Sequence, residues 1–105
     1  MAQRSDGYEI VSSAAINAAC RKLLRKAVQL GKGKEFVRGA RIIINKLQNE
    51  ALTFGEPHFH LRHLELEIRI AIVSPLAICY GVHEKSRSVF IKEVKGLAGV
   101  GLDID

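Results

Sequence analysis

The chain has 105 residues, of which 48% are hydrophobic and 26% charged, the balance of one folded globular domain. A domain of this length builds one core of two packed layers, so we expect no large cofactor. The longest apolar run, Ile70 to Ile78, contains Ser74 and Pro75 and is far shorter than the about 20 residues of a membrane-spanning helix. No apolar segment of a secretory signal follows Arg4. We therefore expect no membrane partner and a cytoplasmic location.

The net charge of +5 is concentrated in one region of the chain. Nine of the sixteen basic residues, but only one of the eleven acidic residues, lie between Arg21 and Lys46. Such a basic region is typical of a protein that binds a polyanion, and a pair of solvated helices explains it equally well. The candidate nucleic-acid contacts in this region are Arg21, Arg25, Lys32 and Lys34.

The domain is expected to extend from residue 8 to residue 95. Residues 1–7 contain no apolar pattern and are predicted to form a flexible lead. Residues 96–105 are rich in glycine and are predicted to form a C-terminal tail. Between them, Tyr8 to Val11 is a short strand-like run that opens the domain.

Two helices are predicted after this strand. Ser12 or Ser13 can cap the first helix. Apolar residues then recur every three or four positions from Ile16 to Leu30, and again from Phe36 to Ala51, which is the spacing of an amphipathic helix. The glycines of residues 31–33 form the turn between them. The pattern predicts an antiparallel helical hairpin.

Three strands are predicted in the second half of the chain. Residues 64–70 alternate strictly, so we expect the apolar residues to face the core, and Glu67 and Arg69 to face solvent. Residues 76–82 are nearly all apolar, as in a central strand, and residues 88–94 form the last strand. The predicted fold class is α+β: a short strand, the helical hairpin, and a three-stranded antiparallel meander with both helices on one sheet face.

The closing strands carry a resemblance to a known family. The segment Glu67 to Ile70, the strand end at Tyr80-Gly81-Val82 and the run Val89 to Ile91 are similar to the pattern of the RelE/ParE superfamily of bacterial toxins. The resemblance covers most of residues 8–95 and implies a β-α-α-β-β-β domain. It also implies a toxin of a type II toxin-antitoxin system, with a cognate antitoxin as partner. One branch of the family cleaves mRNA on the ribosome, and the other binds DNA gyrase.

The resemblance also implies candidate catalytic residues. Arg69 lies near the first basic position of the family, Glu67 beside it is a candidate base, and Lys95 is the cation nearest to the late arginine position, where this chain has Leu97. The tail also lacks the tyrosine or histidine of the cleaving branch. Three possibilities stay open: an mRNA interferase with a degenerate active site, a noncatalytic protein that binds gyrase or another protein, and a non-toxic scaffold.

Two further cations are candidate phosphate contacts. Arg87 and Lys92 lie in and after the last predicted loop, and binding to phosphate needs only cations at a suitable spacing. Lysines that protect an edge strand from aggregation explain Lys92 equally well. Tyr80, in the central strand, is expected to belong to the core.

The histidines and cysteines suggest no further chemistry. The sequence has a His-x-His-x-x-His motif at His58, His60 and His63, but no fourth ligand lies nearby, so we expect no functional metal site. Cys20 and Cys79 are far apart in apolar runs and are expected to be free thiols in the core.

Overall fold

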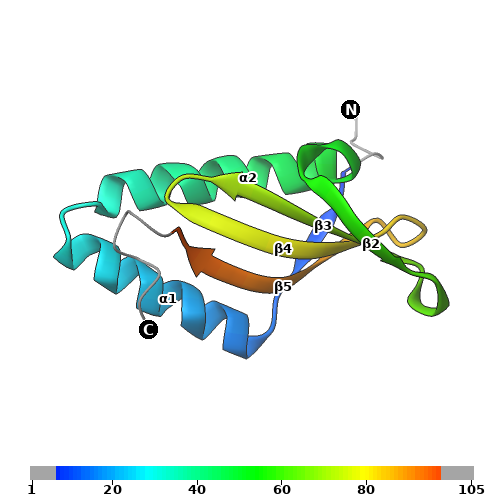
Figure 1. Ribbon diagram of the computed structural model, residues 1–105, viewed down its shortest axis with the longest axis horizontal. Helices are drawn as coiled ribbons and strands as arrows, with labels where there is room; N and C mark the ends of the chain where they lie inside the picture. The colour runs from blue at the N-terminus through cyan, green and yellow to red at the C-terminus, as the bar shows by residue number, and fades with distance from the viewer. Residues whose placement is uncertain (1–6, 98–105) are drawn as a thin grey trace.

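The computed structural model describes residues 7–97, which form two helices and a five-stranded sheet (Figure 1). The predicted α+β class is therefore confirmed. The expectations for the lead at residues 1–6 and for the tail from residue 98 lie outside the described residues. In chain order the elements are β1 (Glu9–Val11), α1 (Ala14–Gln29), α2 (Gly33–Phe54), β2 (Glu56–Leu61), the short 3-10 helix η1 (Arg62–Leu64), β3 (Leu66–Val73), β4 (Leu76–His83) and β5 (Ser88–Gly96).

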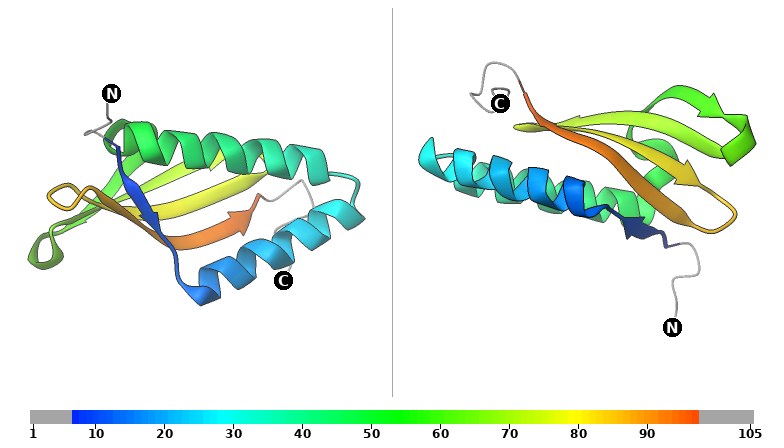
Figure 2. Two further views of the ribbon diagram at one scale, coloured as in Figure 1. Left: turned by 180° about the vertical axis from the view of Figure 1, so that it is seen from behind. Right: turned by 90° about the horizontal axis from the view of Figure 1, so that it is seen from below.

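The predicted helical hairpin is present. Ser13 caps α1, and its hydroxyl accepts a hydrogen bond from the Ile16 amide at 3.1 Å. Gly31 follows α1 with a φ of 75°, a conformation that glycine adopts without strain. The apolar stripe of α2, which includes the buried Ile43 and Leu47, faces the core. Figure 2 shows the two helices side by side and antiparallel.

The sheet is larger than the predicted three-stranded meander. Its strand order is β1-β5-β4-β3-β2, with β1 parallel to β5 and the other neighbours antiparallel. β2 was not predicted from the sequence. The sequence of β2 alternates polar and apolar residues, but the strand begins directly after Gly55 and contains Pro57, which are signals of a break between elements.

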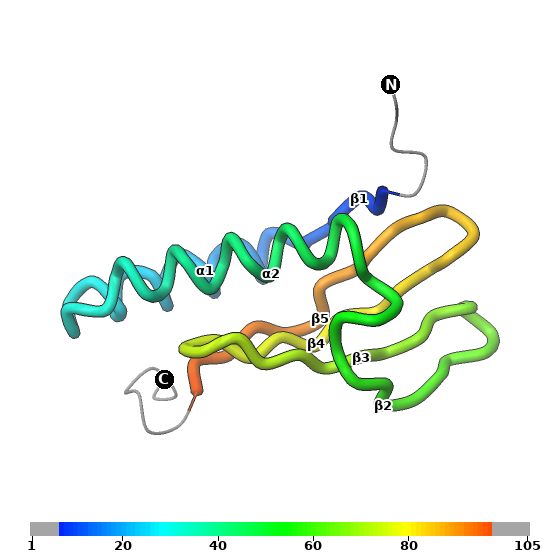
Figure 3. Tube along the Cα trace, turned by 90° about the horizontal axis from the view of Figure 1, so that it is seen from above, coloured from blue at the N-terminus to red at the C-terminus, as the bar shows by residue number. Residues whose placement is uncertain are grey.

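Both helices cover the same face of the sheet, as predicted (Figure 3). α2 contacts β3 and β4, and α1 contacts β5. Tyr80, Leu47 and Val89 are among the fully buried side chains between the two layers, so the prediction that Tyr80 belongs to the core is confirmed. The other sheet face is not covered by any element of residues 7–97.

The predicted orientation of β3 was wrong. Arg69, expected to face solvent, is only 6% exposed and faces the helices, whereas Ile70 is 37% exposed on the uncovered face. The alternation rule assumes that the apolar side of a strand faces the only core. Here β3 has apolar residues on both sides, and Ile68 is fully buried on the uncovered face, where its Cδ1 lies over Gly81. The hydrogen bonds of Arg69 to Gly55 and Glu67 hold its side chain on the helix-facing side.

None of the helices within residues 7–97 combines the length and the apolar composition needed to cross a membrane. The amphipathic pattern of α1 and α2 accounts for this finding, because each helix has one apolar face and one face of basic and polar residues.

Candidate functional site

The three predicted catalytic residues do not share one site. Arg69 and Glu67 form a salt bridge on the helix-facing side of β3. Lys95 lies on the opposite face, where it pairs with Glu93 at 3.4 Å and is the register partner of Ala77. The sheet itself therefore separates Lys95 from the other two residues.

Arg69 belongs instead to a buried cluster at the end of α2. Its Nη2 donates a hydrogen bond to the Gly55 carbonyl, and its Nη1 donates to a carboxylate oxygen of Glu67. The Tyr80 hydroxyl accepts from the Gly55 amide at 2.9 Å and donates to the Ala51 carbonyl at 3.2 Å. Burial raises the pKa of Tyr80, and the Gly55 hydrogen bond and the Arg69 charge oppose only part of that rise. The cluster ties α2 to the sheet.

The uncovered sheet face has an apolar row that crosses every strand. In register order from β1 to β2 this row consists of Val11, Phe90, Gly81, Ile68 and Phe59. Gly81 leaves space that the Ile68 side chain fills, since a Cβ at this position would lie 3.1 Å from Ile68 Cδ1. The two aromatic side chains therefore flank a flat apolar centre.

The two aromatic side chains of this row are accessible. Phe59 is 44% exposed and Phe90 is 38% exposed. The ammonium group of Lys92, from β5, lies 5.9 Å from the centroid of the Phe59 ring on β2 and forms no ion pair within residues 7–97. We call this surface, formed by Phe59, Phe90, Lys92, Ile70 and Ile72, the open sheet face. It presents two aromatic rings, a cation and exposed aliphatic groups together.

Of the residues on this face, Lys92 was a predicted contact, whereas neither phenylalanine was predicted from the sequence. Phe59 was missed because β2 was not predicted, so its side chain had no sheet to lie on. Phe90 was recognisable: in the predicted strand it alternates with Val89 and Ile91, and one of these two sets must face away from the helices.

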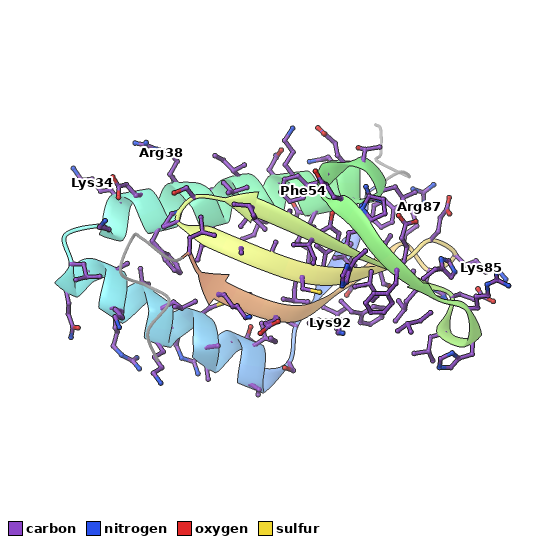
Figure 4. All side chains as sticks on the ribbon, in the orientation of Figure 1. Lys34, Arg38, Phe54, Lys85, Arg87 and Lys92 are labelled. Atoms are coloured by element: carbon purple, nitrogen blue, oxygen red, sulfur yellow. The ribbon has the colours of Figure 1, made fainter. Side chains whose placement is uncertain are left out.

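A second candidate surface lies on the helices. Arg21 and Arg25 on α1 and Lys34 on α2 are exposed, as are Arg38 and Arg41, which the sequence analysis counted in the basic region but did not select. Positions 34, 38 and 41 follow one face of α2, the spacing that could have identified them. None of the five forms an ion pair within residues 7–97. Figure 4 shows Lys34 and Arg38 projecting outward from α2, well away from Lys92. We call these five residues the helical basic face.

The helical basic face borders a shallow apolar depression. Its volume is about 460 Å³, and its lining includes Leu24 and Val28 of α1 together with Val37 of α2. Lys34, Arg38 and Arg41 line the same depression. Three cations of α2 therefore border an apolar floor that lies between the two helices.

The other predicted nucleic-acid contacts are not among these five residues. Lys32 is half-buried and precedes the first residue of α2. Arg87, in the β4–β5 loop, has a φ of 54° and its guanidinium lies 5.5 Å from the centroid of the Tyr8 ring. The six selected cations are thus distributed over the helices, this loop and the open sheet face.

The histidines and cysteines form no evident reactive centre. His58 and His60 lie on β2 and His63 lies in η1, and residues 7–97 contain no cluster of side chains suited to a metal ion. Cys20 and Cys79 are free and half-buried, and burial raises the pKa of each thiol. The prediction of free thiols is confirmed, but Cys79 lies on the open sheet face, beside Ile70 in the register, and not in the helix-facing core.

Comparison with known proteins does not connect the chain to a family. No family model matches it, and no match among curated proteins was found. The resemblance to the RelE/ParE superfamily therefore stays a prediction from the residues of the closing strands.

Proposed function

We propose that this chain is a toxin-like protein of the RelE/ParE type that acts on the translation machinery by binding RNA and does not cleave it. The observation that carries the proposal is the helical basic face, whose five cations have no acidic partner within residues 7–97. The chain order, a strand and two helices followed by antiparallel strands, supports the family assignment. β2 is an addition to the expected β-α-α-β-β-β pattern.

Unpaired cations in this arrangement favour a polyanion. Each phosphate that a lysine or arginine neutralises releases a condensed counterion into solution, and this release drives binding at moderate salt. Lys34, Arg38 and Arg41 present three such cations along one helix face, and Arg21 and Arg25 extend the charge onto α1. No acid has to be displaced from them before phosphate binds.

The positions of the predicted catalytic residues argue for binding without cleavage. General acid-base cleavage of RNA needs its base and its charge-stabilising cation within hydrogen-bond reach of one ribose-phosphate unit. Arg69 uses its Nη atoms on Gly55 and Glu67 beneath α2, and Lys95 lies across the sheet. An RNA strand on either face would meet only part of this set.

The main proposal includes a cognate antitoxin as a protein partner, and the alternative function is binding of a different protein. A cognate antitoxin with an acidic amphipathic segment would fit the depression between the helices, where Val28 and Val37 lie beside Lys34 and Arg38. The second candidate function is noncatalytic binding of gyrase or another protein. It is favoured by Ile72 and Ile70, which are 65% and 37% exposed on the open sheet face.

The first test uses a reconstituted translation reaction to which the purified protein is added. Protein output and the mRNA ends are measured with and without ribosomes. Reduced output with intact mRNA is the expected result. Ribosome-dependent mRNA cleavage would overturn the noncatalytic mechanism, and normal output would overturn action on translation and favour the protein-binding alternative.

The second test compares charge reversals. In the helical variant Lys34, Arg38 and Arg41 are each replaced by glutamate, and in the matched control Lys46, Arg62 and Lys85 are. Both variants have the same net charge. Affinity for a short RNA duplex is measured over a range of salt concentrations. We expect only the helical variant to lose the phosphate contacts. The plot of log affinity against log salt should then become less steep, with the magnitude of its negative slope reduced by about 2 to 3. Equal losses in both variants would contradict a localised site.

A further inference from the structure

We propose that the open sheet face binds single-stranded RNA, with Phe59 and Phe90 stacking on bases and Lys92 neutralising phosphate. This inference deepens the proposed function by adding a second RNA site on the side of the sheet opposite the helices. It rests on the proposed function only in taking RNA as the ligand. Its residues are separate from the helical basic face.

The spacing of the two rings fits two different bases. Phe90 lies on β5 and Phe59 on β2, and they are joined in register through Gly81 of β4 and Ile68 of β3. Three strand spacings separate them, which is about 14 Å. A single base cannot contact both rings, so each ring has a stacking partner of its own. Between the two rings the sheet surface is formed by Gly81, which has no side chain, and by Ile68, which is buried.

The exposure of the rings is what stacking requires. A base stacks on an aromatic side chain whose face is open to solvent, and such stacking tolerates any base. Phe59 and Phe90 keep 44% and 38% of their surface exposed although each lies on a sheet. The edge of the His58 ring contacts Phe59 with centroids 4.9 Å apart, which restricts the position of the Phe59 ring. The position of the Phe59 ring is therefore set before RNA binds, and a base that stacks on it takes the place of the Lys92 ammonium group above the ring.

Lys92 favours RNA over an apolar protein surface. It is exposed, its ammonium group lies over the Phe59 ring from three strands away, and it has no ion-pair partner within residues 7–97. An apolar segment placed on this face would bury that charge without a partner, at a high desolvation cost. A base stacked on Phe59 displaces the ammonium group from the ring, and the phosphates of the same strand then supply an ion-pair partner for it.

The experiment measures binding of a short, unstructured, fluorescently labelled RNA by anisotropy. The variants are Phe59→Ala, Phe90→Ala, the double variant and Lys92→Gln, with Phe59→Tyr and Phe90→Tyr as aromatic controls. Loss of one stacked base weakens affinity by about 5- to 100-fold, so we expect this loss in each alanine variant and near wild-type affinity in each tyrosine variant. Circular dichroism establishes that every variant is folded.

Ile72→Ala separates stacking from general apolar contact. Ile72 is the most exposed large apolar side chain on this face, at 65%, and it has no aromatic plane. RNA binding that tolerates Ile72→Ala but not Phe59→Ala supports stacking. Equal losses in the two variants, or unchanged RNA affinity in the double phenylalanine variant, would overturn the site. Concentration-dependent dimerisation abolished by Ile72→Ala would also overturn it and make the face a contact between copies.

These variants test the two proposed RNA surfaces independently. The helical charge-reversal variant weakens binding to duplex RNA, whereas the phenylalanine variants leave duplex binding unchanged because duplex bases are not free to stack. Maleimide labelling gives an independent readout, since Cys79 lies on the open sheet face and Cys20 on α1. Bound single-stranded RNA should slow labelling of Cys79 and not of Cys20. Equal labelling with and without RNA would contradict occupation of this face.

Discussion

Arg69 and Tyr80 are register partners on β3 and β4, and both hold the same residue, Gly55. The guanidinium donates to the Gly55 carbonyl, and the tyrosine hydroxyl accepts from the Gly55 amide at 2.9 Å. Gly55 is the first residue after α2, so the two side chains fix the helix end against the middle of the sheet. This relationship explains why a charged residue is buried in β3.

Tyr80→Phe tests the tyrosine half of this arrangement. The substitution keeps the ring, which stacks on Phe54 with centroids 6.2 Å apart, and removes only the hydroxyl. The Gly55 amide and the Ala51 carbonyl each lose a partner at a buried position. We expect the free energy of unfolding to fall by about 1 to 3 kcal/mol, measured by urea denaturation. The matched control is Tyr8→Phe, and an equal effect of the two substitutions would contradict the role of the Tyr80 hydroxyl.

Gly55→Ala tests the close approach of the chain to the sheet. A Cβ at Gly55 would lie 2.7 Å from the Ile70 carbonyl oxygen and 2.9 Å from the Tyr80 hydroxyl oxygen, and neither contact can be relieved without moving the backbone or breaking the hydrogen bond. Overpacking of this kind destabilises a protein by about 1 to 3 kcal/mol. We therefore expect a lowered melting temperature in calorimetry.

Gly31→Asn is the control for Gly55→Ala. Gly31 has a φ of 75° and no atom within 4 Å of an added Cβ, and asparagine adopts this conformation more readily than other residues. We expect Gly31→Asn to change stability much less than Gly55→Ala. A larger loss at Gly31 would show that helix termination, and not contact with the sheet, is the sensitive feature.

Stability at alkaline pH should depend on Tyr80. Burial raises its pKa above the ordinary value of 10.0, so the folded state favours the neutral phenol. This contribution to stability is complete below pH 10.0 and is lost as the pH rises through the folded-state pKa. As the pH rises above about 10.0, the unfolding free energy of the native chain should therefore fall more steeply than that of Tyr80→Phe. Parallel curves for the two proteins would contradict the raised pKa.

The helices and the strands β3 to β5 were predictable because each follows a simple rule. Apolar spacing marks α1 and α2, and β4 is an apolar run as expected for a central strand. β2 also alternates, but it was missed because Gly55 and Pro57 at its start indicate a break in the chain and an edge strand exposed on both faces buries little apolar surface. The facing of β3 was predicted wrongly for a different reason. The burial of Arg69 depends on Gly55 and Tyr80, which lie 14 and 11 positions away in the sequence.

The candidate surfaces were predictable to different degrees. The basic region pointed to the helices because consecutive turns of a helix bring residues such as Lys34 and Arg38 to one side. The open sheet face needs the pairing of four strands to bring Phe59 near Lys92, and no local pattern contains that information. The predicted catalytic set combined residues from opposite faces because Glu67 and Arg69 of β3 were assigned to the wrong face of the sheet.

Charge reversal at Arg69 and at Lys95 should have different consequences, although both were predicted to be catalytic. Arg69→Glu places a second carboxylate beside Glu67 at a site with 6% exposure, and leaves the Gly55 carbonyl without its donor. An unpaired buried charge lowers the free energy of unfolding by about 3 to 5 kcal/mol. Lys95→Glu alters an exposed pair with Glu93 and should change it by less than about 0.5 kcal/mol. Urea denaturation of both variants, beside growth assays of cells expressing them, distinguishes the two cases. Loss of toxicity in Arg69→Glu then reflects unfolding, and a folded, stable Arg69→Glu protein would contradict the structural role assigned to Arg69.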